Sequence, residues 1–257
     1  FNSDLQRDIH SLYLREAVDI EAGDLDGVRD AARRNGVSVV LGIAERPRDR
    51  GGHSIYCSAV TVNALGEIAS VHRKLTPTYE ERLSWANGDG HGLVTHQLGP
   101  FTFGTLNCWE NWMPLSRTAL YAQGEDLHVA LWPGDVYDTT DITRFIALES
   151  RSYVISVSGV LHRDGIPDSM PGAEIMREAS DEQISTGGTC IAAPDGSWVV
   201  EPIDTREGLT VATLDHGQVR RERQNFDPVG HYGRPDVTRL VVDRRRQTLA
   251  IFTDETP

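Results

Sequence analysis

Cys108 is the residue whose type and position best suit covalent chemistry. An apolar run over residues 101–107 predicts a strand that ends just before it, and Pro114 predicts the start of a helix soon after it. A thiol at such a turn stands above the sheet edge, where helix N-terminal amides and a nearby cation lower its pKa and favour the nucleophilic thiolate. From its position alone, Cys108 could equally be a small buried side chain. We interpret Cys57 and Cys190, which lie inside strand-like runs, as buried side chains of that kind.

A basic segment could supply that cation. His72, Arg73 and Lys74 stand together where a strand-like run ends, and a loop with a proline and aromatic residues follows. Glu80 and Glu81 in this loop could pair with the lysine. A solvated charged loop is the alternative interpretation of the segment.

Other common signals of catalysis or binding are missing from the sequence. It has neither a G-x-S-x-G nor an H-E-x-x-H motif, and its nine histidines lack metal-ligand spacing. The net charge of −13 argues against a nucleic-acid partner, because phosphates are bound by positive surfaces. Three scattered cysteines favour free thiols and a cytoplasmic location over a disulfide framework or a zinc site. No apolar run reaches the ~18 residues that a membrane span needs.

The surrounding pattern predicts the elements that must position these residues. Residues 24–36 have the spacing of an amphipathic helix and lead into a strand over 37–43. Hairpins are predicted over 55–72 and around 98–107, the second leading into Cys108, and a loop with one short helix over 162–186. Further strands are predicted at 127–132, 153–161, 189–193, 197–201 and 209–214, extended segments at 237–242 and 248–252, and helices at 114–124, 141–152 and 216–225.

Strands that come singly and in hairpins, with helices between them, favour an α/β fold with a mixed sheet. Helices on the outer faces of two packed sheets would give a four-layer α-β-β-α sandwich. A chain of 257 residues suits one large domain or two small ones.

Four stretches together resemble the nitrilase branch of the carbon–nitrogen hydrolase superfamily. The likeness extends from about residue 10 to about residue 240. The Cys108-Trp109-Glu110 triplet favours the nitrilase branch over the amidase and carbamoylase branches. The four stretches are residues 72–90, 107–115, 147–151 and 226–236.

The resemblance implies a fold, an activity and a set of site residues. It implies the α-β-β-α sandwich and the hydrolysis of an organic nitrile to a carboxylic acid and ammonia, through a covalent thioimidate and thioester and without a metal or organic cofactor. Lys74 takes the lysine's place, Cys108 the nucleophile's, and Glu81 that of a glutamate that orients the site. Trp109, through its backbone N–H, and Trp132 are candidates for oxyanion and substrate contacts. The alternatives are an amidase or carbamoylase, and an inactive scaffold or filament protein.

One part of the family pattern is missing from this sequence. The general-base glutamate of the family lies in a Phe-Pro-Glu-type motif that does not occur here, and Glu45 aligns with a later strand end. We therefore expect residues 1–257 to form one carbon–nitrogen hydrolase domain without its first strand, first helix and glutamate loop. Three explanations stay open. The start of the chain was cut or is undescribed, the missing part is a separate chain, or an inactive protein has lost it. The resemblance also implies dimers or larger helical or ring-shaped oligomers, with contacts through 114–124 and 226–236.

Overall fold

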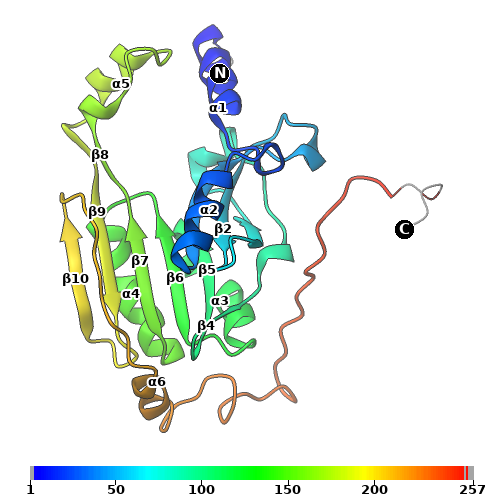
Figure 1. Ribbon diagram of the computed structural model, residues 1–257, viewed down its shortest axis with the longest axis vertical. Coiled ribbons are helices and arrows are strands. Elements are labelled where there is room, and N and C mark those ends of the chain that lie inside the picture. The colour runs from blue at the N-terminus through cyan, green and yellow to red at the C-terminus, as the bar shows by residue number, and fades with distance from the viewer. Residues whose placement is uncertain (1–2, 252, 254–257) are drawn as a thin grey trace.

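Two β-sheets of unequal size form the centre of the computed structural model, which describes residues 3–251 and 253 (Figure 1). The small sheet is antiparallel and contains β1 (Val39–Glu45), β2 (Tyr56–Val62) and β3 (Ile68–Arg73) in that order. The large sheet has the order β10-β9-β7-β6-β5-β4, and β8 pairs with β9 beside this path. Its strands are β4 (His96–Leu98), β5 (Phe101–Asn107), β6 (Leu127–Trp132), β7 (Tyr153–Ser158), β8 (Val160–His162), β9 (Gln183–Ala192) and β10 (Trp198–Asp204).

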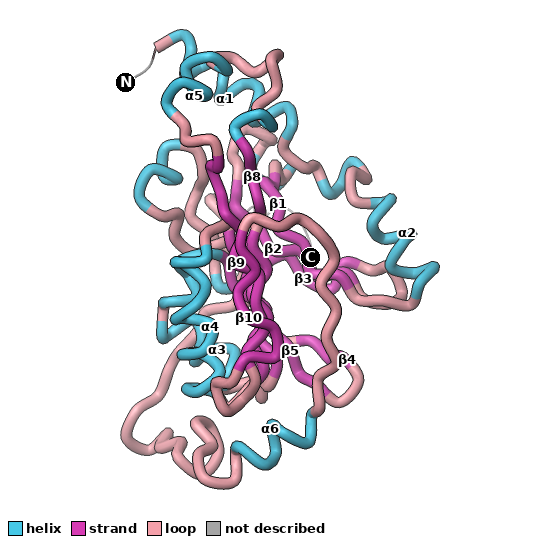
Figure 2. The backbone as a smooth tube through the Cα atoms, turned by 90° about the vertical axis from the view of Figure 1, so that its left-hand side faces the viewer, coloured by secondary structure: helices cyan, strands magenta, loops and turns pink. Residues whose placement is uncertain are grey.

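Helices cover the outer faces of the two sheets. Figure 2 shows α3 and α4 on one side of the large sheet, the small sheet on its other side, and α2 beyond the small sheet. This arrangement confirms the predicted four-layer α-β-β-α sandwich. Within the described residues, no helix combines the length and the apolar character needed to cross a bilayer. The helices are α1 (Asp4–Glu16), α2 (Asp26–Asn35), α3 (Pro114–Tyr121), α4 (Val136–Ser150), α5 (Ala173–Ala179) and α6 (His216–Glu222), with short 3-10 helices that include η3 (Tyr79–Leu83) and η5 (Cys108–Trp112).

Clusters of apolar side chains hold the layers together. Ile142 and Ile146 of α4 pack with Val154 of the large sheet. On the opposite face of that sheet, Val129 belongs to a cluster against which Val40 of the small sheet packs. A further cluster joins α2 to the small sheet. Each fully buried side chain of this size stabilises the fold by roughly 1.5–3 kcal/mol.

The order of the strands brings several chain segments to one edge of the large sheet. Strands β5, β6 and β7 are parallel neighbours, so their carboxyl ends meet at the same edge. Cys108 follows β5 directly, Pro133 follows β6, and Lys74 follows β3 of the small sheet. The predicted nucleophile and its predicted cation therefore come from strand ends in different sheets.

Most predicted elements are present with shifted bounds. Strand β6 has the predicted bounds, whereas the predicted strand over 153–161 is divided into β7 and β8. Helix α4 begins at Val136 instead of Asp141, because its first turns hold β-branched and aromatic residues with a low helix propensity that hides the start. The predicted loop over 162–186 contains α5 and the first part of β9, and α1 has no counterpart in the prediction.

The predicted strand over residues 209–214 is wrong, because this segment belongs to neither sheet. Leu209 and Val211 are 91% and 79% exposed. A strand forms only where a neighbouring strand pairs with its backbone groups, and the described residues provide no such neighbour here. The extended segments predicted at 237–242 and 248–252 are likewise unpaired as far as they are described, and Phe252 lies outside the described residues.

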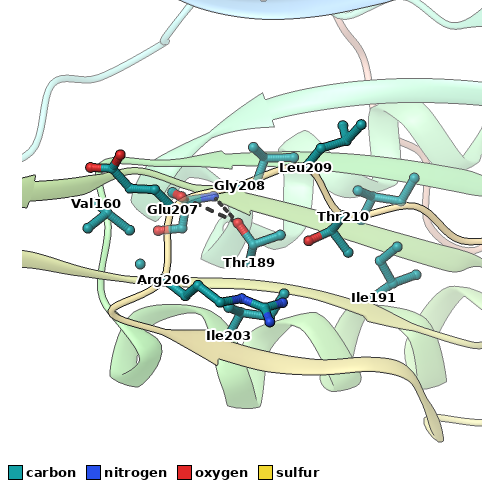
Figure 3. A pocket seen from close by; sticks show the side chains of 13 residues that line it. Val160, Thr189, Ile191, Ile203, Arg206, Glu207, Gly208, Leu209 and Thr210 are labelled. Atoms are coloured by element: carbon teal, nitrogen blue, oxygen red, sulfur yellow. Dashed lines mark hydrogen bonds between the residues drawn. The ribbon is translucent and has the colours of Figure 1, made fainter.

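Part of the inner face of the large sheet is only loosely covered. Residues 206–210 cross it over β7, β9 and β10 and enclose a cavity of about 700 Å³. Figure 3 shows Thr189, Ile191 and Ile203 on the sheet side of this cavity. The small sheet lies over β5 and β6 instead (Figure 1). Within the described residues, this stretch of sheet surface therefore has no second layer of strands.

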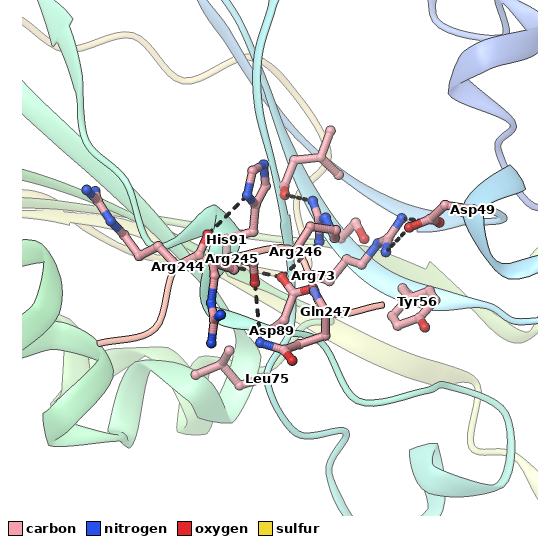
Figure 4. Close-up of polar contacts among 12 residues, drawn as sticks. Asp49, Tyr56, Arg73, Leu75, Asp89, His91, Arg244, Arg245, Arg246 and Gln247 are labelled. Atoms are coloured by element: carbon pink, nitrogen blue, oxygen red, sulfur yellow. Dashed lines mark hydrogen bonds and ion pairs between the residues drawn. The ribbon is translucent and has the colours of Figure 1, made fainter. Parts of the chain in front are cut away.

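The last described part of the chain fastens the loop that follows β3. The Asp89 carboxylate accepts hydrogen bonds from Arg246 Nη1 and from the Gln247 backbone N–H, each at 3.0 Å (Figure 4). Gly88, the neighbour of Asp89, donates its N–H to the Lys74 carbonyl at 2.8 Å. The loop between Lys74 and Gly88 is thus closed at its base and tied to the C-terminal segment.

Candidate active site

Cys108 occupies a strained turn between β5 and η5. Its φ is 54°, in the left-handed region that costs a non-glycine residue roughly 1–2 kcal/mol. Two buried side chains hold the turn. The Glu110 carboxylate accepts a hydrogen bond from the Asn107 N–H at 3.1 Å, and the Asn111 amide donates one to the Cys108 carbonyl at 2.8 Å. The predicted strand-to-helix turn at Cys108 is confirmed, with a 3-10 helix as its first helical element.

Lys74 is buried to 1% exposure at the end of β3, and its ammonium is paired. Its Nζ donates hydrogen bonds to Thr78 Oγ1 at 2.9 Å and to Glu81 Oε2 at 2.6 Å. Glu81 also accepts a hydrogen bond from the Thr78 backbone N–H at 2.6 Å. Since the ammonium and the carboxylate compensate each other, the site can keep a cation in a buried position.

The structure brings Lys74 and Cys108 together. The Lys74 ammonium and the Trp109 backbone N–H are close enough to the Cys108 thiol to favour its thiolate form. Burial nevertheless raises the thiol pKa above its usual value, and the ammonium and the N–H offset this only in part. The prediction of a lowered thiol pKa is therefore wrong, because sequence patterns do not reveal the depth of burial. In the same cavity, burial raises the pKa of Cys57 to about 12.

A cavity of about 260 Å³ exposes the thiol between the two sheets. The larger cavity on the inner face of the large sheet has no cysteine in its lining, so the smaller one is the candidate site. Its walls are mostly apolar and come from β1, β2, the loop after Lys74, and the ends of β5 and β6. The lining residues are Gly42, Ile43, Ala44, Cys57, Glu81, Trp85, Asn107, Cys108, Leu131, Trp132 and Pro133.

The four tryptophans in and around the Cys108 turn and its cavity divide into two pairs. Trp85 and Trp132 line the cavity beside Cys108. Trp109 and Trp112 stack on each other with ring centroids 6.2 Å apart, and they are 45% and 42% exposed. Trp109 thus faces the thiol with its backbone N–H while its ring lies outside this cavity.

Glu45 does not belong to the site. Its carboxylate accepts hydrogen bonds from Arg73 Nε and Nη2, at 3.0 and 2.8 Å, and from Ser58 Oγ at 2.6 Å. Among the described residues that line the cavity, Glu81 is the one carboxylate, and it is engaged with Lys74. The geometry agrees with setting Glu45 aside as a general base.

A buried polar network beneath the turn escaped the sequence interpretation. Asn111 Oδ1 lies 2.9 Å from His128 Nε2, and His128 Nδ1 lies 2.9 Å from Glu125 Oε1. Arg117 donates to the Asn111 carbonyl at 2.7 Å. These residues are well separated along the chain, so local spacing does not reveal the network. Within the described residues, no group of three or more His, Cys, Asp or Glu side chains could hold a metal ion.

The sequence interpretation also gave Glu110 no structural role, although its spacing from Asn107 predicts one. The spacing Asn107-x-x-Glu110 is that of a capping box, and both of its hydrogen bonds form at η5. That spacing predicts a carboxylate folded back onto the start of the nucleophile turn.

Comparison with known proteins agrees with this geometry. A model of the family described as carbon-nitrogen hydrolase matches residues 10–224. An aliphatic nitrilase from Sinorhizobium fredii is 37% identical over 239 residues, which cover 93% of this chain and 75% of that protein. Nitrilase 1 from Arabidopsis thaliana is 33% identical over 250 residues, covering 96% of this chain and 71% of that protein. A crystal structure of a carbon-nitrogen hydrolase from Helicobacter pylori G27 has the same fold, with a TM-score of 0.64 at 18% identity over 80% of this chain and 70% of that one.

Proposed function

The chain belongs to the carbon–nitrogen hydrolase family, and from that premise we propose that it is a nitrilase that uses Cys108 as its nucleophile. The single observation that carries the proposal is the pairing of a strained-turn thiol with a buried ammonium in one cavity. The names of the similar proteins favour a nitrile over an amide as the substrate.

The proposed chemistry begins with addition of the Cys108 thiolate to the electrophilic nitrile carbon. Negative charge develops on the nitrogen, and the Lys74 ammonium and the Trp109 N–H stabilise it while it takes up the proton that the thiol has lost, which yields a thioimidate. Water then adds to the thioimidate carbon and ammonia leaves, so that a thioester remains. A second water attacks the thioester and releases the carboxylic acid and the thiol.

Both water-consuming steps need a group that accepts a proton from water. Lys74 has to stay protonated in order to stabilise the nitrogen, and Glu81 is already engaged with Lys74 and with the Thr78 N–H. We therefore propose that the base is a glutamate outside these 257 residues, and that Glu81 orients the ammonium.

Unused strand-forming surfaces support this proposal. Apart from an isolated bridge between Val18 and Glu45, the outer edge of β1 has no neighbouring strand among the described residues. The segment 209–214, which is unpaired among the described residues, begins beside the cavity of about 700 Å³ on the face of the large sheet. Unpaired strand edges are disfavoured in folded proteins, so we propose that a further strand pairs with β1 and that its segment brings the glutamate to the cavity beside Cys108.

The proposed function is tested by ammonia release from a nitrile and from its matching amide. The 257-residue chain alone should release little or no ammonia, and addition of a polypeptide that carries the glutamate motif should restore release from the nitrile. Robust nitrile hydrolysis by the chain alone would contradict the missing-base proposal, and Glu45 and Glu81 would then be the residues to mutate. Preference for the amide would point to an amidase.

We also propose a cytoplasmic enzyme that assembles with copies of itself. Three free cysteines suit a reducing compartment. Large apolar side chains are exposed next to α3, where Met113 is 56% and Leu115 is 65% exposed, and Tyr232 in the segment 226–236 is 60% exposed. We propose that these two exposed segments take part in the contacts between copies.

A further inference from the structure

Glu110 is a buried carboxylate to which the proposed mechanism gives no role. It lies in η5, two residues after Cys108, and is 4% exposed. Its Oε1 accepts a hydrogen bond from the Leu75 backbone N–H at 2.9 Å. Its Oε2 accepts one from the Asn107 N–H at 3.1 Å and lies 2.8 Å from His72 Nε2. One carboxylate therefore holds three partners from two chain segments.

The two backbone partners of Glu110 flank the two proposed reactive groups. Leu75 directly follows Lys74, and Asn107 directly precedes Cys108. Lys74 is at the end of a strand of the small sheet, whereas Cys108 is at the end of a strand of the large sheet. The Glu110 carboxylate thus ties the backbone beside the ammonium to the backbone beside the thiol.

His72 fixes the carboxylate from the other side. It is fully buried, and its Nδ1 has no hydrogen-bond partner, so Glu110 is the one polar contact recorded for its ring. Burial opposes ionisation of Glu110, but His72 and the two backbone N–H groups outweigh it and hold the pKa of the carboxyl below its usual range. An ionised carboxylate accepts all three hydrogen bonds without rearrangement.

We propose that Glu110 is a positioning residue that sets the separation between the Lys74 ammonium and the Cys108 thiol. The proposal rests on the proposed roles of Lys74 and Cys108. The strained φ of Cys108 makes such a tie necessary, because a freed turn would relax and carry the thiol away from the ammonium. Glu110 acts through the other two residues and does not line the cavity.

The test is the rate at which iodoacetamide alkylates Cys108 as a function of pH, with each cysteine followed by peptide mass. This readout does not require nitrile turnover. The charged and titratable groups that influence the thiol are Lys74 and Glu81 from the loop after β3, and Cys57 from β2. Glu110→Gln keeps the shape of the side chain but removes its charge. We expect the alkylation profile to move to higher pH, with a rate about tenfold lower at a pH below the thiol pKa, the consequence of a one-unit shift.

A double-mutant cycle separates positioning from a general effect on the fold. In a Lys74→Gln background, Glu110→Gln should cause no shift to higher pH, because there is no ammonium left to position and the loss of a negative charge by itself favours the thiolate. Asp126→Asn is the matched control. Its carboxylate also accepts a backbone N–H, from Thr102 at 2.8 Å, and pairs with His216 at 2.7 Å, but it lies at the opposite end of β5. This control should lower the thermal midpoint and leave the Cys108 profile unchanged.

Two results would overturn the proposal: a Glu110→Gln profile that does not move to higher pH, or a shift to higher pH that persists in the Lys74→Gln background. If Glu110→Gln does not fold, Glu110→Asp replaces it; this variant keeps the charge but is too short to reach both backbone partners, and the same outcomes apply. Should the protein release no ammonia from nitriles even when it is supplied with a polypeptide that carries the glutamate motif, the proposed function fails, and the alkylation cycle still decides the role of Glu110.

Discussion

Replacement of Asn111 by alanine is expected to relax the turn that presents the thiol. Asn111 is fully buried, donates to the Cys108 carbonyl at 2.8 Å, and meets His128 Nε2 with its amide oxygen at 2.9 Å. The alanine variant leaves a carbonyl and a ring N–H without these partners. A buried polar group without a partner costs about 1–3 kcal/mol, so the free energy of unfolding should fall by about 2–6 kcal/mol.

The same change should affect the chemistry. Once its carbonyl is released, Cys108 no longer has to keep a φ of 54°, and relaxation to a negative φ moves the thiol away from Lys74. A displacement of about 1 Å in a reactive group lowers turnover by about 10²-fold. Nitrile turnover by the protein supplied with its base, and alkylation of Cys108, should both slow.

Urea unfolding measures the loss of stability, and iodoacetamide labelling measures the effect on the thiol. Thr143→Val is the matched control, because Thr143 is also fully buried and makes two hydrogen bonds of 2.6 Å, to the Thr139 carbonyl and to Ser156 Oγ. It should destabilise the fold without slowing the labelling of Cys108. Asn111→Ala with a wild-type labelling rate and normal turnover would refute the argument that this network holds the nucleophile turn.

Three further predictions concern the ammonium, the pH dependence and the assembly. Lys74→Arg should abolish turnover although it keeps the charge, because the wide planar guanidinium cannot replace a compact buried ammonium. A near-normal kcat would show that Lys74 contributes only a long-range electrostatic effect. The folded-state pKa of Glu110 is depressed, so its contribution to stability is present above about pH 4.5, its usual pKa, and is lost as the pH falls through the lower folded value. The difference in unfolding free energy between wild type and Glu110→Gln should therefore be large at pH 7 and shrink in acid, and urea unfolding that gave a constant difference would contradict this. Light scattering should detect dimers or larger assemblies at micromolar concentration, and a monomer would argue against the proposed self-association.

Local sequence patterns predicted the elements whose formation depends on nearby residues. The run that ends at Asn107 marked the Cys108 turn, and the bounds of β6 were predicted as they occur. The segment 209–214 has the same strand-forming residue types, but the described residues offer it no strand to pair with, so it forms none. Pairing partners are a property of the fold, and a local pattern cannot report them.

The site shows the same division between local and long-range information. Lys74 and Cys108 were predicted from motifs, whereas the contact of Glu110 with His72 joins residues 38 positions apart. The raised thiol pKa of Cys108 depends on burial by both sheets, which no local pattern reports. Sequence reasoning therefore predicted the groups that we propose as reactive but not the side chains that hold them.

The most direct test of the central claim is the intact mass of the protein after incubation with an organic nitrile. If Cys108 attacks the nitrile carbon and the 257-residue chain lacks its base, the chain should gain the mass of one nitrile as a thioimidate. Peptide mapping should place the addition on Cys108, and Cys108→Ala should gain no mass. An adduct on another residue, or nitrile hydrolysis that continues in Cys108→Ala, would contradict the account.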